Sequence, residues 1–68
     1  MKLSARNQLP GTVVAVSKGP VSSSVKIDIG GGVMITSSVT SETIDELGLA
    51  VGDKVTAIVK ASDVLIGK

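Results

Sequence analysis

The sequence predicts an all-β domain with one short helix, built as a five-stranded OB-type barrel in the order β-β-β-α-β-β. Three observations carry this prediction. Apolar residues alternate with polar ones over most of the chain, glycine-containing turns separate the alternating stretches, and a single segment carries helix-capping signals. With 68 residues, the chain is predicted to form one domain over residues 1–68. An SH3-like barrel is the alternative, but it would not need a capped helix after its third strand.

The strands are expected where the apolar pattern has a period of two. Val25, Ile27 and Ile29 alternate with Lys26 and Asp28, as in a strand with one buried face. The same pattern predicts further strands at residues 12–17, 33–39 and 54–61, and a short fifth strand at residues 63–66. Turns are expected at residues 18–20, 30–32 and 52–53, where glycine is followed by proline, glycine or aspartate.

Some strand residues are apolar on the face opposite the expected core. Val14, Val16 and Ile58 alternate with residues that are better candidates for the core. This pattern favours burial of a second surface of the sheet by another subunit. A chain of this length buries only roughly 60% of the surface that its unfolded form exposes. Because the sequence has no Cys and no His, disulfides and the commonest metal sites are excluded as extra sources of stability. Oligomerisation is therefore expected.

The helix is predicted at residues 41–47. Thr40 is the expected N-cap, and Val39 and Ile44 have the spacing of a hydrophobic staple. Gly48 is expected to end the helix in a left-handed conformation, with Leu49 closing a Schellman-type cap. The helix is thus about two turns long.

Composition argues against several classes of function. Without His or Cys, and with its six carboxylates dispersed, the chain is predicted not to be an enzyme, with no catalytic residues, no catalytic cofactor and no metal-cation ligands. Two of these carboxylates, Glu42 and Asp45, are expected near the start of the helix, where they favour its dipole. The absence of aromatic residues and a net charge of +1 argue against nucleic-acid binding. No apolar run approaches the ~20 residues of a membrane span, and no signal peptide is recognisable, so a cytoplasmic protein without membrane contacts is expected.

Small hydroxyl side chains are abundant, with nine Ser and five Thr. They form polar clusters at residues 4–7, 40–43 and 60–62, and these clusters include Arg6 and Lys60. Each cluster alone has an ordinary structural explanation, as a solvated terminus, a helix cap or a strand end. Together, two cations, several hydroxyls and the N–H groups at a helix start suit a tetrahedral dianion, which accepts hydrogen bonds and donates none.

Three segments, SARNQL, ITSSVTSETIDELGL and VKASDVLI, resemble the molbindin family, the Mop domains of molybdate-binding proteins. The similarity covers essentially all 68 residues in the same element order. The resemblance implies an OB-type barrel that assembles as a homohexamer, a trimer of dimers, and holds molybdate or tungstate at subunit interfaces. The implied function is intracellular binding, storage and buffering of these oxyanions. The alternative is an OB-type assembly or regulatory module without an oxyanion cargo of its own.

The resemblance also implies which residues bind. For the main oxyanion site these are Ser4, Arg6, Asn7 in a positioning role, Thr40, Thr43, Lys60, Ala61 through its backbone N–H, and Ser62. A possible second oxyanion site near the trimer axis would use Lys18, Gly19, Val21 and Ser22. Relatives often carry Asn at the position of Ser22, and Pro20 has no N–H to donate.

Overall fold

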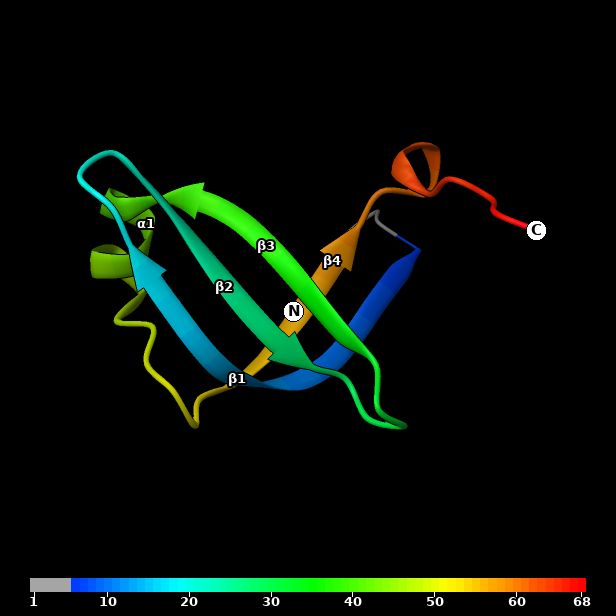
Figure 1. Ribbon diagram of the computed structural model, residues 1–68, viewed down its shortest axis with the longest axis horizontal. Coiled ribbons are helices and arrows are strands. Elements are labelled where there is room, and N and C mark those ends of the chain that lie inside the picture. The colour runs from blue at the N-terminus through cyan, green and yellow to red at the C-terminus, as the bar shows by residue number, and fades with distance from the viewer. Residues whose placement is uncertain (1–5) are drawn as a thin grey trace.

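The computed structural model describes residues 6–68 as a strongly curled antiparallel sheet with one short helix at one end (Figure 1). Its elements are β1 (Asn7–Lys18), β2 (Ser22–Asp28), β3 (Met34–Thr40), α1 (Ser41–Leu47), β4 (Lys54–Val59) and the 3-10 turn η1 (Ala61–Asp63). The strand order in the sheet is β3-β2-β1-β4, and all neighbours are antiparallel. The prediction of a mostly β fold with one short helix is confirmed.

The predicted fifth strand is not formed. Ala61–Asp63 make a 3-10 turn, and residues 64–68 have no regular secondary structure. The side chains of Leu65 and Ile66 are each 91% exposed. Apolar alternation indicates a strand only where a neighbouring strand supplies hydrogen bonds, and none does so for these residues in the described chain. The described residues therefore contain four strands, and the predicted five-stranded OB-type barrel is not established.

The first strand is longer than predicted because it pairs with two partners in turn. Its first half pairs with β4, from Asn7 opposite Val59 to Thr12 opposite Lys54. Its second half pairs with β2. The pairing with β4 overrides the turn tendency of the proline and glycine at positions 10 and 11. Gly11 lies at the bend, where a Cβ atom would come within 2.6 Å of the carbonyl oxygen of Asp28.

A β-bulge in β1 breaks the strict alternation of faces. Val13 pairs with Ile27 and Ala15 pairs with Lys26, so Val14 is an extra residue between them. As a result Val13 is 1% exposed and Val14 is 38% exposed, while Val16 packs against the core again. The expectation that Val14 and Val16 lie on the same face is therefore wrong.

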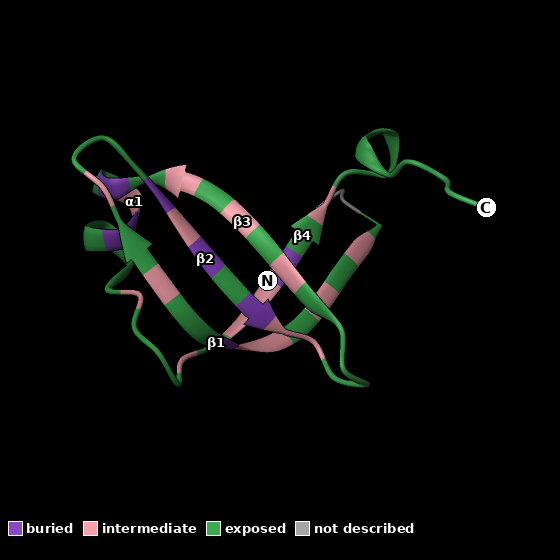
Figure 2. Cartoon of the chain, in the orientation of Figure 1, coloured by how far each residue is buried: buried purple, intermediate pink, exposed green. Residues whose placement is uncertain are grey.

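The core is small and lies inside the curl of the sheet. Its buried hydrophobic residues are Val13, Val25, Ile27, Ile44 and Ala57, four from strands and one from α1 (Figure 2). Full burial of a valine or isoleucine side chain contributes about 1.5–3 kcal/mol. The buried side chains of residues 6–68 thus supply only a small hydrophobic stabilisation.

An apolar groove of about 440 Å³ remains open along the sheet. Its lining includes Ile35 and Val39 of β3, Leu49 after the helix, and Ala57 and Val59 of β4. β3 and β4 are the two edge strands of the sheet, so the groove lies between edges that do not pair with each other. The curled sheet therefore stays open along this side.

The helix forms as predicted. The Thr40 Oγ1 atom accepts a hydrogen bond from the backbone N–H of Thr43 at 3.1 Å, which caps the first turn. At the other end Gly48 has φ +61°, and the N–H of Leu49 donates to the carbonyl of Ile44 at 3.1 Å. Both predicted caps of α1 are confirmed.

Candidate functional site

The described residues of the predicted sites form two groups at opposite ends of the molecule. We call the first group the basic end, which consists of Arg6, Asn7, Lys60, Ala61 and Ser62. The second group, the helix end, consists of Lys18, Gly19, Val21, Ser22, Thr40 and Thr43. The twelve residues of β1 run from one end to the other, in a molecule 35 Å long in its longest dimension. Ser4 of the predicted site lies outside the described residues.

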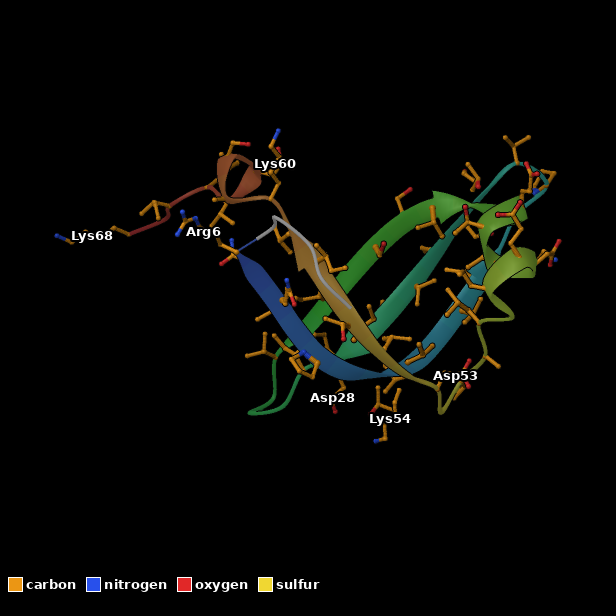
Figure 3. The ribbon with its side chains drawn as sticks, turned by 180° about the vertical axis from the view of Figure 1, so that it is seen from behind. Arg6, Asp28, Asp53, Lys54, Lys60 and Lys68 are labelled. Atoms are coloured by element: carbon orange, nitrogen blue, oxygen red, sulfur yellow. The ribbon has the colours of Figure 1, made fainter. Side chains whose placement is uncertain are left out.

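The basic end is held together by the pairing of β1 with β4. Asn7, the first residue of β1, lies opposite Val59, the last residue of β4. Arg6 and Lys60 therefore adjoin the ends of neighbouring strands, and Figure 3 shows both side chains at this end of the molecule. Both are exposed, and among residues 6–68 no carboxylate lies within ion-pair distance of either cation. Two unpaired positive charges at the same end of the molecule favour a bound anion.

The 3-10 turn η1 (Ala61–Asp63) follows Lys60 at the basic end. The N–H of Asp63 donates to the carbonyl of Lys60 at 2.9 Å, and the N–H of Val64 donates to the carbonyl of Ala61 at 3.3 Å. Ala61 and Ser62 are exposed within this turn. The turn thus presents a serine hydroxyl beside the lysine that ends the strand.

At the helix end, the predicted residues of the two oxyanion sites are neighbours. Ser22 of β2 pairs with Thr40 of β3. The Thr40 and Thr43 hydroxyls are hydrogen-bonded to each other, with 2.8 Å between the two Oγ1 atoms. The structure thus brings Thr40 and Thr43 together with the turn at residues 19–22, but separates them from Arg6 and Lys60 along the whole length of β1.

Ser41 connects this turn to the helix. Its backbone N–H donates to the carbonyl of Val21 at 2.8 Å, and its hydroxyl donates to the carbonyl of Gly19 at 2.6 Å. The same hydroxyl lies 2.8 Å from that of Ser23, and both serines are buried. These two hydroxyls are therefore structural rather than ligand-binding. Sequence alone does not separate them from exposed serines such as Ser22, because their partners are distant in the chain.

Lys18 forms an ion pair with a residue that the sequence did not connect to it. Its Nζ atom lies 2.5 Å from Oδ1 of Asp45, across 27 positions of the sequence. Both side chains are about half exposed or more, at 50% and 64%. The expected role of Asp45 near the helix start gave no signal of this contact, which depends on the tertiary packing of α1 beside the end of β1.

The functional groups that the two ends together offer to a ligand are positive charges and hydroxyl donors. Within residues 6–68, no three His, Cys, Asp or Glu side chains lie close enough to hold a metal ion. None of the helices in that part of the chain is long and apolar enough to cross a membrane. A set of donors of this kind suits a ligand that is negatively charged and accepts hydrogen bonds.

These features define a small antiparallel β domain with exposed cationic and hydroxyl side chains at its ends. The TOBE domain family matches residues 3–66, so the chain belongs to the TOBE domain family. A relative in Haemophilus influenzae, described as a probable molybdenum-pterin-binding protein, is 49% identical over 67 residues, which cover 98% of this chain and 97% of the relative. The predicted resemblance to the Mop family is thereby confirmed.

Solved structures of similar proteins have the same fold. MopII from Clostridium pasteurianum superposes with a TM-score of 0.93 at 45% identity, covering 98% of this chain and all of its own. A molybdate-binding protein from Sporomusa ovata gives a TM-score of 0.92 at 38% identity, with both chains fully covered. The cytoplasmic molybdate-binding protein ModG, with molybdate bound, gives 0.90 at 46% identity, covering 96% of this chain and 46% of ModG.

Proposed function

We propose that this protein binds molybdate, and tungstate in the same way, and that it stores and buffers these oxyanions in the cytoplasm without catalysing a reaction. The observation that carries the proposal is the likeness, over nearly the whole chain, to structures described as molybdate-binding proteins. ModG is described as cytoplasmic, which supports the proposed location. Residues 1–68 would act as a single Mop-type domain.

The positions of the predicted ligands support a site that two chains build together. Arg6 and Lys60 lie at one end of the molecule (Figure 3), and Thr40 and Thr43 lie at the start of α1 at the other end, with β1 running between the two ends. In a homo-oligomer the basic end of one protomer can meet the helix end of its neighbour. One chain would then contact the oxyanion through its two cations, Ser4, Ser62 and the N–H of Ala61. The other chain would contribute the threonine hydroxyls. Asn7 would position the start of β1.

The apolar surface of the described chain supports this assembly. The groove between β3 and β4 and the exposed Leu65 and Ile66 leave hydrophobic area that a second copy would cover. We propose a homohexamer, a trimer of dimers, in which Lys18, Gly19, Val21 and Ser22 contribute a second oxyanion site near the threefold axis. No nucleic acid or membrane partner is part of this proposal.

Selectivity would come from the size of the cavity and the placement of donors. Molybdate, tungstate and sulfate share charge and tetrahedral shape, so charge alone does not separate them. Each contact between unit charges near 4 Å contributes at most roughly 4 kcal/mol at an effective dielectric constant of about 20. Phosphate is disfavoured further, because its protonated form carries an O–H donor, and the cations and the backbone N–H of the site cannot accept its hydrogen bond.

Calorimetric titration tests the proposal. Molybdate should give a saturable heat, and sulfate a much weaker one. Arg6→Ala and Lys60→Ala should each weaken molybdate binding about ten- to a hundredfold, because each removes a charge-assisted hydrogen bond. Lys26→Ala is the matched control, since Lys26 is exposed on β2 outside both predicted sites. Absent or equal heats for the two anions would contradict the proposal and favour the alternative, a module without an oxyanion cargo.

A mixing experiment tests whether the main site spans two chains. Arg6→Ala removes a ligand from the basic end, and Thr43→Ala removes one from the helix end while keeping the Thr40 cap. If the two variants are unfolded together and reassembled, random association leaves about a quarter of the interfaces with both ends intact. Molybdate titration should then recover about that fraction of tight sites. No recovery in a mixture that has reassembled would show that each site lies within one chain.

A further inference from the structure

We propose that Asp45 sets the affinity of the second oxyanion site, where its carboxylate competes with the oxyanion for the ammonium group of Lys18. This inference rests on the proposed function and deepens it. It predicts the order in which the two proposed kinds of oxyanion site fill. The sites at the basic end have unpaired cations and fill first, and those at Lys18 fill only at higher oxyanion concentration.

The geometry supports direct competition. The Lys18 Nζ atom and the Asp45 Oδ1 atom are 2.5 Å apart, so the carboxylate lies where an oxygen of a bound anion would accept a hydrogen bond from this ammonium. By contrast, no carboxylate of residues 6–68 lies within ion-pair distance of Arg6 or Lys60. The cation of the second site thus has an internal counter-ion that the cations of the main site lack.

An oxyanion can also displace the Asp45 carboxylate from Lys18 at little cost in stability. Both side chains are half exposed or more, and exposed ion pairs contribute little to stability and are screened by salt. A tetrahedral dianion can therefore replace the carboxylate. It must still bind beside a like charge, since Asp45 remains attached to the helix a few ångströms away. Asp45 therefore weakens binding both by occupying Lys18 and by repelling the anion.

Displacement of Asp45 requires only a side-chain movement. α1 is anchored by Ile44, which is buried in the core, and by Ser41, which is bonded to the carbonyl of Gly19 directly after Lys18. The Asp45 backbone carbonyl accepts a hydrogen bond from Gly48, and an asparagine at position 45 would keep this bond. The charge can thus be removed without disturbing the helix or the turn.

The test is a set of molybdate titrations at one fixed ionic strength, with wild type, Asp45→Asn, Glu46→Gln and Lys18→Ala. Glu46 is the matched control, because it is the next residue of α1, is exposed, and changes the net charge by the same amount. Lys18→Ala identifies the weaker class of sites by abolishing it. Asp45→Asn should tighten that class roughly three- to thirtyfold and leave the tighter class unchanged. Glu46→Gln should leave both classes as in wild type.

The outcomes separate this inference from the proposed function. If wild type binds no molybdate, the proposed function fails and the inference fails with it. If wild type binds and Lys18→Ala removes no class of sites, or if Asp45→Asn leaves the weaker class unchanged, the inference alone is overturned. Equal tightening by Asp45→Asn and Glu46→Gln would show an effect of net charge rather than competition at Lys18, and would also overturn it. Thermal melting of each variant without molybdate confirms that the fold is kept.

Discussion

The two ends of this small sheet differ in how their polar groups are used. At the helix end, the hydroxyl of Ser41 bonds to Gly19 and Ser23, Thr40 caps α1, and Lys18 pairs with Asp45. At the basic end, Arg6, Lys60 and Ser62 are exposed, and the segment that follows them carries apolar side chains into solvent. The helix end thus uses most of these polar groups in contacts within the chain, whereas the basic end leaves its cations and the apolar side chains that follow them exposed.

This difference separates polar groups that stabilise the fold of the chain from polar groups that remain free for contacts outside it. The helix end satisfies its own hydrogen bonds, so it can form before any ligand or second subunit arrives. The basic end keeps two cations and apolar residues 64–66 available for contacts outside the chain. Identical substitutions made at the two ends should therefore have different consequences, and three matched pairs follow, in order of decreasing effect.

The largest difference is expected between Ile44→Ala and Ile66→Ala. Ile44 is buried in the core, so its truncation should lower the free energy of unfolding by about 2–5 kcal/mol at any protein concentration. Ile66 is exposed in the single chain and should act only through assembly. In Ile66→Ala, the dependence of the melting temperature on protein concentration should become weaker. Melting curves over a hundredfold range of concentration measure both effects.

A concentration dependence identical to wild type in Ile66→Ala would contradict a role of the C-terminal segment in assembly. A negligible effect of Ile44→Ala would contradict the anchoring of α1 in the core. Analytical ultracentrifugation of the same samples provides the control, because it reports the oligomeric state directly.

The fold of the helix end could be predicted largely from local sequence. Thr40, Ile44 and Gly48 have the spacing of a capped two-turn helix, and these signals depend on residues only a few positions apart. The strand at residues 63–66 was predicted from the same kind of pattern and is wrong, because pairing requires a neighbour that local sequence does not reveal. The extra residue in β1 at Val14 was missed for a similar reason, since a bulge is defined by the partner strand.

The second pair is Ser41→Ala and Ser62→Ala. Ser41 is buried, and its removal leaves the carbonyl of Gly19 and the hydroxyl of Ser23 each without a partner, which should cost about 1–3 kcal/mol. Ser62 is exposed in η1, so its removal should change stability by less than about 0.5 kcal/mol in the absence of molybdate. Urea unfolding without the ligand measures both values. Similar losses in the two variants would show that the ends are equally structured.

The candidate site was predictable in its residue types but not in its arrangement. The resemblance identified Arg6, Lys60, Thr40 and Thr43, yet no sequence pattern shows that β1 separates the first two from the last two. The contact between Lys18 and Asp45 was also missed, because it joins elements 27 positions apart. Charge pairs of this kind depend on how elements pack, whereas motifs report only which residues are present.

The smallest difference is expected between Gly48→Ala and Gly67→Ala. Gly48 has φ +61° at the end of α1, a conformation that costs a residue with a Cβ atom about 1 kcal/mol. No atom lies near a Cβ built on Gly67, and its φ is not in the left-handed region, so Gly67→Ala should change stability by less than about 0.5 kcal/mol. Gly48→Asn should fall between glycine and alanine at position 48, because asparagine tolerates the left-handed conformation better than alanine does. Urea unfolding of the three variants therefore separates a conformational cost at position 48 from a steric one. Because the space around Gly48 is open, the loss of stability should follow the left-handed strain. A loss of stability that grew with side-chain volume instead would contradict this account.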